Sequence, residues 1–172
     1  MESSKLSFKL FADGFDGPIE QFVPVFHSWI QTHAIPDHLL VDVADYAHVH
    51  QGPGIVLVAH EANYSFDLRG GRAGLTYQRK RPLPGSLSDR ITAVFNATLA
   101  AAALLSDRVK FRNDEIEFRV CDRLHAPNTA QTFESLRPEL LRLFPEAQLW
   151  RNENELELFT VTIRPAQPIV LR

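Results

Sequence analysis

The chain is poor in cysteine, the residue that crosslinks many small proteins through disulfides or zinc sites. It contains 172 residues and a single cysteine, Cys121. It can therefore form neither an intramolecular disulfide nor a zinc site built from cysteine pairs. A chain of this length buries roughly 70% of its unfolded surface on folding, which suffices for a hydrophobic core without crosslinks. We expect one globular domain over residues 1–172 and no cofactor.

Long hydrophobic runs are also missing. The longest uncharged apolar stretch, residues 91–105, is 15 residues long, whereas a membrane-spanning helix needs about 20. The N-terminus carries charges at Glu2, Lys5 and Lys9 and lacks the apolar segment of a secretory signal peptide. We therefore predict a cytoplasmic protein that does not associate with membranes, and we interpret 91–105 as a buried helix.

Charge is present but unevenly distributed. Residues 1–68 hold two basic residues and nine acids, whereas residues 69–172 hold 16 basic residues and 12 acids. Six of the seven histidines lie in the acidic part. The overall net charge of −3 therefore hides an acidic, histidine-rich first part and a basic remainder.

Alternation of apolar and polar residues predicts strands, and helical spacing predicts three helices. The helices are expected at 18–30, with a kink at Pro24, at 87–105, opened by a capping box of Ser86 and Asp89, and at 129–144, capped by Asn128. The strands are expected at 5–11, 39–49, 55–68, 73–81, 109–112, 115–121, 148–151 and 155–163.

These patterns favour the α+β class because hairpin-length connections dominate. We predict a mainly antiparallel sheet made of β-hairpins, with about three helices packed on one side. Residues 87–121 and 129–163 would each contain a helix followed by a hairpin. This order is compatible with a weak internal repeat, but independent use of similar turns is the simpler explanation.

The turns set a register for the strands between 39 and 81. A loop at 51–54 would place Asp45 opposite His60, and His60 in turn would lie opposite Arg81. A carboxylate, an imidazole and a guanidinium in one row could orient His60 as a general base or bind a small anion. The alternative is an ion pair that closes one end of the core.

Paired glycines at 70–71 predict a tight turn that places Tyr64 opposite Tyr77, with Arg79 one step along. The candidate site therefore contains His60 and Asp45 as catalytic residues, and Arg79, Arg81, Tyr64 and Tyr77 as ligand-binding residues. No sequence motif of a catalytic nucleophile accompanies them.

A metal-dependent hydrolase built on the pair His48 and His50 is a third hypothesis. In the predicted register, however, His48 projects from the face opposite to His60, so the three histidines cannot share one ion. We therefore predict no metal site that includes His60.

The segment 69–81 carries five basic residues and no acid, which predicts a basic hairpin. A sequence pI near 6.1 argues against nucleic acid as its partner. An acidic protein surface, including a second copy of this chain, suits it better. Our leading hypothesis is a non-enzymatic binding module, and the alternative is an anion-binding protein or enzyme that uses Asp45, His60 and Arg81.

Overall fold

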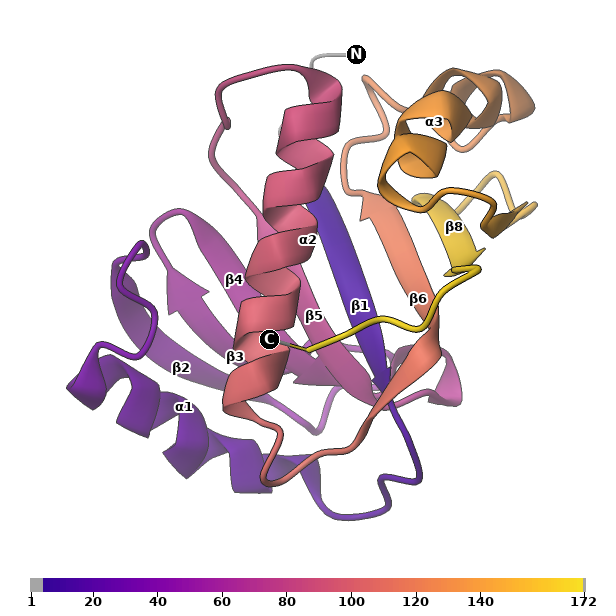
Figure 1. Cartoon of the computed structure of the whole chain (residues 1–172). Coiled ribbons are helices and arrows are strands. Elements are labelled where there is room, and N and C mark those ends of the chain that lie inside the picture. The colour runs from indigo at the N-terminus through magenta and orange to yellow at the C-terminus, as the bar shows by residue number, and fades with distance from the viewer. Residues whose placement is uncertain (1–4, 172) are drawn as a thin grey trace.

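One antiparallel sheet organises residues 5–171, the part of the chain that the computed structural model describes (Figure 1). Its strands run in the order β2-β3-β4-β5-β1-β6-β8-β7, so the N-terminal strand lies near the centre. This arrangement confirms the predicted α+β class with an antiparallel sheet. The strands are β1 (Leu6–Ala12), β2 (Leu40–Tyr46), β3 (Gly54–Ala59), β4 (Ala62–Asp67), β5 (Gly74–Arg79), β6 (Phe111–Val120), β7 (Gln148–Arg151) and β8 (Phe159–Arg164).

Three helices cover one face of this sheet, as predicted (Figure 1). Helix α1 (Phe22–Thr32) follows a short 3-10 turn, η1 (Ile19–Gln21), and packs near β2. Helix α2 (Leu87–Leu104) crosses β1 and β5, and α3 (Ala130–Leu143) lies beside α2. The capping box of Ser86 and Asp89 forms at the start of α2. It provides acceptors for two backbone N–H groups that the helix itself leaves unpaired.

Aromatic side chains fill the space between the helices and the sheet. Phe8 of β1 contacts Phe95 of α2, with ring centroids 5.3 Å apart. Phe66 of β4 stacks on Phe22 of α1 at 4.0 Å. Alternate residues of a strand face opposite sides of the sheet. On β1 and β4, the residues that alternate with Phe8 and Phe66 therefore lie on the face that no helix covers.

The hairpin of β4 and β5 has the predicted register, with Tyr64 opposite Tyr77. It turns through η2 (Arg69–Gly71), in which Gly70 and Gly71 both have positive φ. The preceding strand was predicted wrongly. Residues 55–68 are not one strand but β3 and β4, joined by a turn at His60 and Glu61.

This turn changes which β3 side chains reach the core. Ile55 pairs with Phe66 and Leu57 pairs with Tyr64, so Ile55 and Leu57 face the helices. A continuous strand would have placed Val56 and Val58 there instead. The reason is that a tight turn resets the alternation of side chains between the two faces.

The predicted register of β2 against β3 is also wrong. Strand β2 ends at Tyr46, and Asp45 pairs with Ile55. The connection therefore spans residues 47–53, which is longer than the predicted loop at 51–54. Its extra residues shift every pair along β2.

The expected hairpin at 109–121 is a single strand, β6, which runs through Asn113 and Asp114 and pairs with both β1 and β8. A helix followed by a hairpin therefore occurs only in the second of the two proposed repeat units, where β7 pairs with β8.

The cap of α3 is Thr129, whose hydroxyl accepts a hydrogen bond from the N–H of Thr132. Asn128 instead donates to the carbonyls of Asn152 and Asn154.

Two glycines with positive φ, Gly54 and Gly70, differ in how closely other atoms pack around them. Gly54 has φ +70°, and an added Cβ would lie 2.1 Å from the carbonyl oxygen of Phe66. Gly70 has a similar φ, +67°, with no atom within 4 Å of the added Cβ. We expect Gly70→Ala to cost about 1–2 kcal/mol through its backbone conformation. Gly54→Ala should cost a further 1–3 kcal/mol or so because of overlap.

Denaturant unfolding of the two variants measures this difference, since both carry the same backbone penalty. Equal losses of stability would show that the β3 backbone can move away from Phe66 and would contradict the expectation.

Candidate functional site

The sheet face opposite the helices is polar, although much of it is buried. Two transverse rows cross neighbouring strands, and every member points away from the helices. Ser7, Lys9, Ser65, Thr76 and Thr160 are less than 9% exposed. A buried polar face of this kind is unusual, because buried polar groups need partners. The rows are Asn63, Gln78, Ser7, Arg119 and Thr160, and Ser65, Thr76, Lys9, Glu117 and Thr162.

Lys9 and Asp67 form an ion pair at the centre of this face. The Lys9 ammonium lies 2.6 Å from Asp67 Oδ1, and the two side chains are 2% and 0% exposed. The ammonium also donates to the carbonyl of Arg72 at 2.7 Å. Burial lowers the pKa of Lys9, while Asp67 opposes that shift. The carboxylate therefore stabilises the charged lysine against its loss of hydration.

The Asp67 carboxylate has further donors. The Thr76 hydroxyl donates to Oδ2 at 2.7 Å, and the backbone N–H of Arg69 donates to Oδ1 at 3.0 Å. These donors stabilise the buried carboxylate, because they occupy the acceptor sites on its oxygens that water would fill in the unfolded chain. These contacts hold η2 against β1 and β5.

A cavity of about 420 Å³ opens on this face beside the ion pair. Strands β1, β6 and β8 contribute its floor. On one side lie η2 and the loop between β2 and β3, which are joined by a hydrogen bond from the Gly70 N–H to Gln51 Oε1. On the other side lies the loop between β7 and β8. The lining residues are Lys9, Gln51, Arg69, Gly70, Glu117, Arg119, Arg123, Asn152, Glu157, Leu158 and Thr160.

Glu117 and Arg119 are neighbours on the cavity floor. The Arg119 Nη2 donates to Glu117 Oε1 at 2.8 Å, and each side chain is 19% exposed. Burial raises the pKa of Glu117, although Lys9 and Arg69 lower it. Desolvation therefore outweighs the nearby positive charges at this carboxylate.

The cavity has more hydrogen-bond donors than protein acceptors. A guanidinium carries five N–H donors. Within residues 5–171, Arg119 uses its side chain for a hydrogen bond to Glu117 alone. Arg123 donates to the carbonyl of Leu156, and Arg69 Nη2 makes two long contacts, at 3.4 Å to Asp67 and 3.3 Å to Thr76. The unused donors suit a ligand that is rich in acceptor oxygens.

Cys121 lies near this cluster. Burial raises the pKa of its thiol to about 11, more than Arg69 lowers it. Because the thiolate is the strongly nucleophilic form, this shift disfavours nucleophilic chemistry at Cys121.

The row predicted from Asp45 through His60 to Arg81 does not form. Asp45 pairs with Ile55, which lies five residues before His60, roughly 17 Å away at the rise of a strand. The carboxylate of Asp45 instead accepts a hydrogen bond from the N–H of Ala47. His60 and Arg81 do share an open depression of about 350 Å³. Both are exposed, and Asp45 lies too far along the sheet to orient His60.

The other three predicted site residues meet a different histidine. Tyr77 Oη lies 2.9 Å from His38 Nε2, and Arg79 Nη1 donates to Tyr77 Oη at 3.5 Å. The rings of Tyr64 and Tyr77 meet edge to face at 4.9 Å. Burial lowers the pKa of His38. Sequence reasoning missed His38 because it precedes β2 in a segment with no regular pattern.

Tyr64 and His38 line a second, mostly apolar cavity of about 430 Å³ between residues 34–38 and α2. Tyr64 is 1% exposed, and burial raises its pKa. Tyr64 is therefore a neutral core residue that reaches this cavity, whereas Tyr77 is equally buried but does not line it.

The two histidines proposed for a metal site, His48 and His50, are exposed in the loop between β2 and β3. Within residues 5–171, no group of three or more His, Cys, Asp or Glu side chains is arranged to hold a metal ion. Both histidines line a surface depression of about 410 Å³, and the hydrolase hypothesis stays a prediction.

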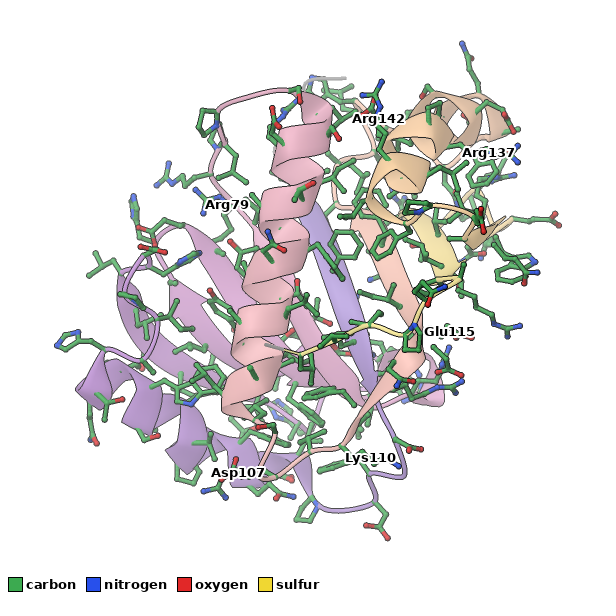
Figure 2. The ribbon with its side chains drawn as sticks, in the orientation of Figure 1. Arg79, Asp107, Lys110, Glu115, Arg137 and Arg142 are labelled. Carbon is green, nitrogen blue, oxygen red and sulfur yellow. The ribbon has the colours of Figure 1, made fainter. Side chains whose placement is uncertain are left out.

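The basic segment 69–81 does not project as a free arm. Strand β5 lies inside the sheet between β4 and β1. Arg72 forms an ion pair with Glu115, and its guanidinium stacks on Phe11 at 3.5 Å. Glu115 also pairs with Arg164 at 3.0 Å. Figure 2 shows Glu115 on β6 and Arg79 at the end of β5, on opposite sides of α2.

No model of a known protein family matches the chain, and no curated protein shows significant sequence similarity to it. In the described part of the chain, no helix has the length and apolar character that crossing a membrane requires. The site must therefore be interpreted from its geometry.

Breaking the central ion pair should destabilise the protein. Lys9→Met leaves the buried Asp67 carboxylate without its closest cation, since among the described residues only the Arg69 guanidinium at 3.2 Å remains. Removing one partner of a buried pair typically costs about 3–5 kcal/mol. Lys110→Met is the matched control, because the ammonium of Lys110 lies 2.9 Å from Asp13 Oδ2 while its side chain is 81% exposed. It should cost less than about 1 kcal/mol. Urea unfolding measures both losses, and similar values would show that burial does not strengthen the Lys9 contact.

Proposed function

We propose that the protein binds a small anion through its carboxylate or phosphate oxygens, in the cavity on the helix-free face of the sheet. The observation that supports this proposal is the surplus of guanidinium donors around the cavity. Arg69, Arg119 and Arg123 all line it, and each has more N–H groups than protein acceptors to receive them.

The chemistry of the lining favours an anion over a neutral sugar or an apolar molecule. Guanidinium groups bind carboxylate and phosphate oxygens in a bidentate manner. Four basic side chains line the cavity against two acidic ones, Glu117 and Glu157. Glu157 already accepts hydrogen bonds from Asn152 and Asn154. Asp67 holds the Lys9 ammonium, so the positive charge available to a ligand comes from the guanidinium groups.

The dimensions also fit a small molecule. Binding cavities for small molecules span about 300–1,000 Å³, and this one has about 420 Å³. Its walls come from loops, whereas its floor comes from central strands held by the Lys9–Asp67 pair. A rigid floor with adjustable walls is a common way to place binding residues.

This proposal keeps the ligand chemistry of our alternative hypothesis but moves the site. The interaction-module hypothesis depended on a basic hairpin that would project towards a partner. Arg72 of that hairpin is instead paired with Glu115 and stacked on Phe11, and β5 lies inside the sheet. An acidic protein partner therefore has less support than a small anion.

Replacement of Arg119 should weaken anion binding. Arg119→Gln removes a charge-assisted donor worth about 1.5–3 kcal/mol, so the dissociation constant should rise roughly 10–100-fold. The probes are inorganic phosphate, sulfate, succinate and citrate, titrated while the amide resonances of the protein are followed by NMR.

The matched control is Arg112→Gln. Arg112 lies on the same strand, but its guanidinium pairs with Asp114 at 2.9 Å and it does not line the cavity. Affinity should be unchanged in this variant. If none of the four anions shifts resonances around the cavity, or if both variants weaken binding equally, the proposal is wrong.

A further inference from the structure

We infer that the anion enters this cavity together with a proton that is taken up by Glu117. This inference rests on the proposed function, because it concerns the same cavity and the same Arg119 guanidinium. It assigns Glu117 a role that anion binding alone does not require, and it makes the affinity depend on pH.

The position of Glu117 is the starting point. Its carboxylate lies on the cavity floor and is the acceptor of Arg119 Nη2 at 2.8 Å. An anion that binds the guanidinium of Arg119 must approach this carboxylate closely. Two negative charges would then share a partly desolvated space, which disfavours keeping both ionised.

Charged groups surround Glu117 from several elements. Lys9 faces it from β1, where the two residues are paired, and Asp67 acts on it from β4. Arg69 and Arg72 contribute from the turn between β4 and β5. On β8 its paired neighbour is the uncharged Thr162. Arg119 on β6, Arg123 beyond the end of β6 and Glu157 from the loop between β7 and β8 line the same cavity. The Cys121 thiol, next to the end of β6, also interacts with Glu117.

These neighbours do not supply a compensating positive charge when the anion arrives. The Lys9 ammonium is held by Asp67 at 2.6 Å and by the carbonyl of Arg72 at 2.7 Å, and Arg72 is paired with Glu115. Only Arg119 directly bonds the Glu117 carboxylate within the described residues. Arg69 and Arg123 also line the cavity, but they donate to other acceptors. Once the anion engages the Arg119 guanidinium, protonation therefore removes the negative charge that Glu117 would otherwise hold against the anion.

Protonation also adds a ligand contact. One proton from the solvent forms an O–H bond on the Glu117 carboxyl, and no other bond is made or broken. The neutral carboxyl then becomes a hydrogen-bond donor, as the surrounding guanidinium groups are. Burial already raises the pKa of Glu117 in the free protein. Protonating Glu117 therefore requires less free energy than protonating an exposed glutamate.

Linkage sets the sign of the pH dependence. If the anion raises the pKa of Glu117, protonation must tighten anion binding by the same factor. The affinity should therefore increase as the pH falls through the window between the pKa of Glu117 in the complex and its pKa in the free protein. The limiting slope is one tenfold change per pH unit, for one proton per anion.

The test uses sulfate, because its own charge is constant between pH 5 and 8. Isothermal titration calorimetry in two cationic buffers with different heats of ionisation, bis-Tris and imidazole, counts the protons taken up per sulfate bound. The full chain should take up between zero and one proton, reaching its maximum within the window. Glu117→Gln keeps an acceptor for Arg119 and should bind sulfate with no uptake and a flat pH profile.

Glu157→Gln is the matched control, because Glu157 lines the same cavity but already accepts hydrogen bonds from two asparagines. It should retain the proton uptake. Sulfate binding by the unmodified chain without proton uptake at any pH from 5 to 8 would overturn this inference and leave the proposed function intact. If neither sulfate nor the other three anions binds, the proposed function itself fails. The measurement on the unmodified chain decides the matter even if Glu117→Gln does not fold.

Discussion

The buried Lys9–Asp67 ion pair connects parts of the chain that are far apart in sequence. Lys9 lies on the central strand β1, Asp67 ends β4, and the lysine also bonds the carbonyl of Arg72 beyond the turn. Neither charge could remain buried alone, because an isolated ion in the interior loses far more hydration energy than packing returns. The pair therefore requires β1, β4 and the turn between β4 and β5 to come together at once.

This requirement explains why the second face of the sheet stays polar. An antiparallel sheet can leave one face in water, yet here the central positions are buried and carry charges. Glu115, clamped between Arg72 and Arg164, extends the same pattern to β6 and β8. The interior charges are matched, whereas the guanidinium groups at the cavity are only partly matched. That difference separates the structural part of the face from the part suited to a ligand.

Local chemistry was sufficient to predict several elements from the sequence. The paired glycines of η2 gave the register of β4 and β5, and Ser86 with Asp89 marked the start of α2. The candidate site was less accessible to this reasoning. The loop at 47–53 is longer than its Gly and Pro residues suggested, and the turn at His60 changes the face on which β3 side chains lie. These two errors placed Asp45 next to His60 in the predicted register. The contact of Tyr77 with His38 was missed because His38 precedes β2 in an irregular segment.

The sequence by itself determined the α+β class, the antiparallel character of the sheet and the three helices, because alternation, helical spacing and capping depend on residues a few positions apart. Tertiary structure alone decided which charges meet. Lys9 and Asp67 are separated by 58 residues, and Arg119 reaches the cavity only because β6 pairs with β1 and β8. No local pattern encodes such contacts, since they depend on the order of strands in the sheet and on the length of each loop between them.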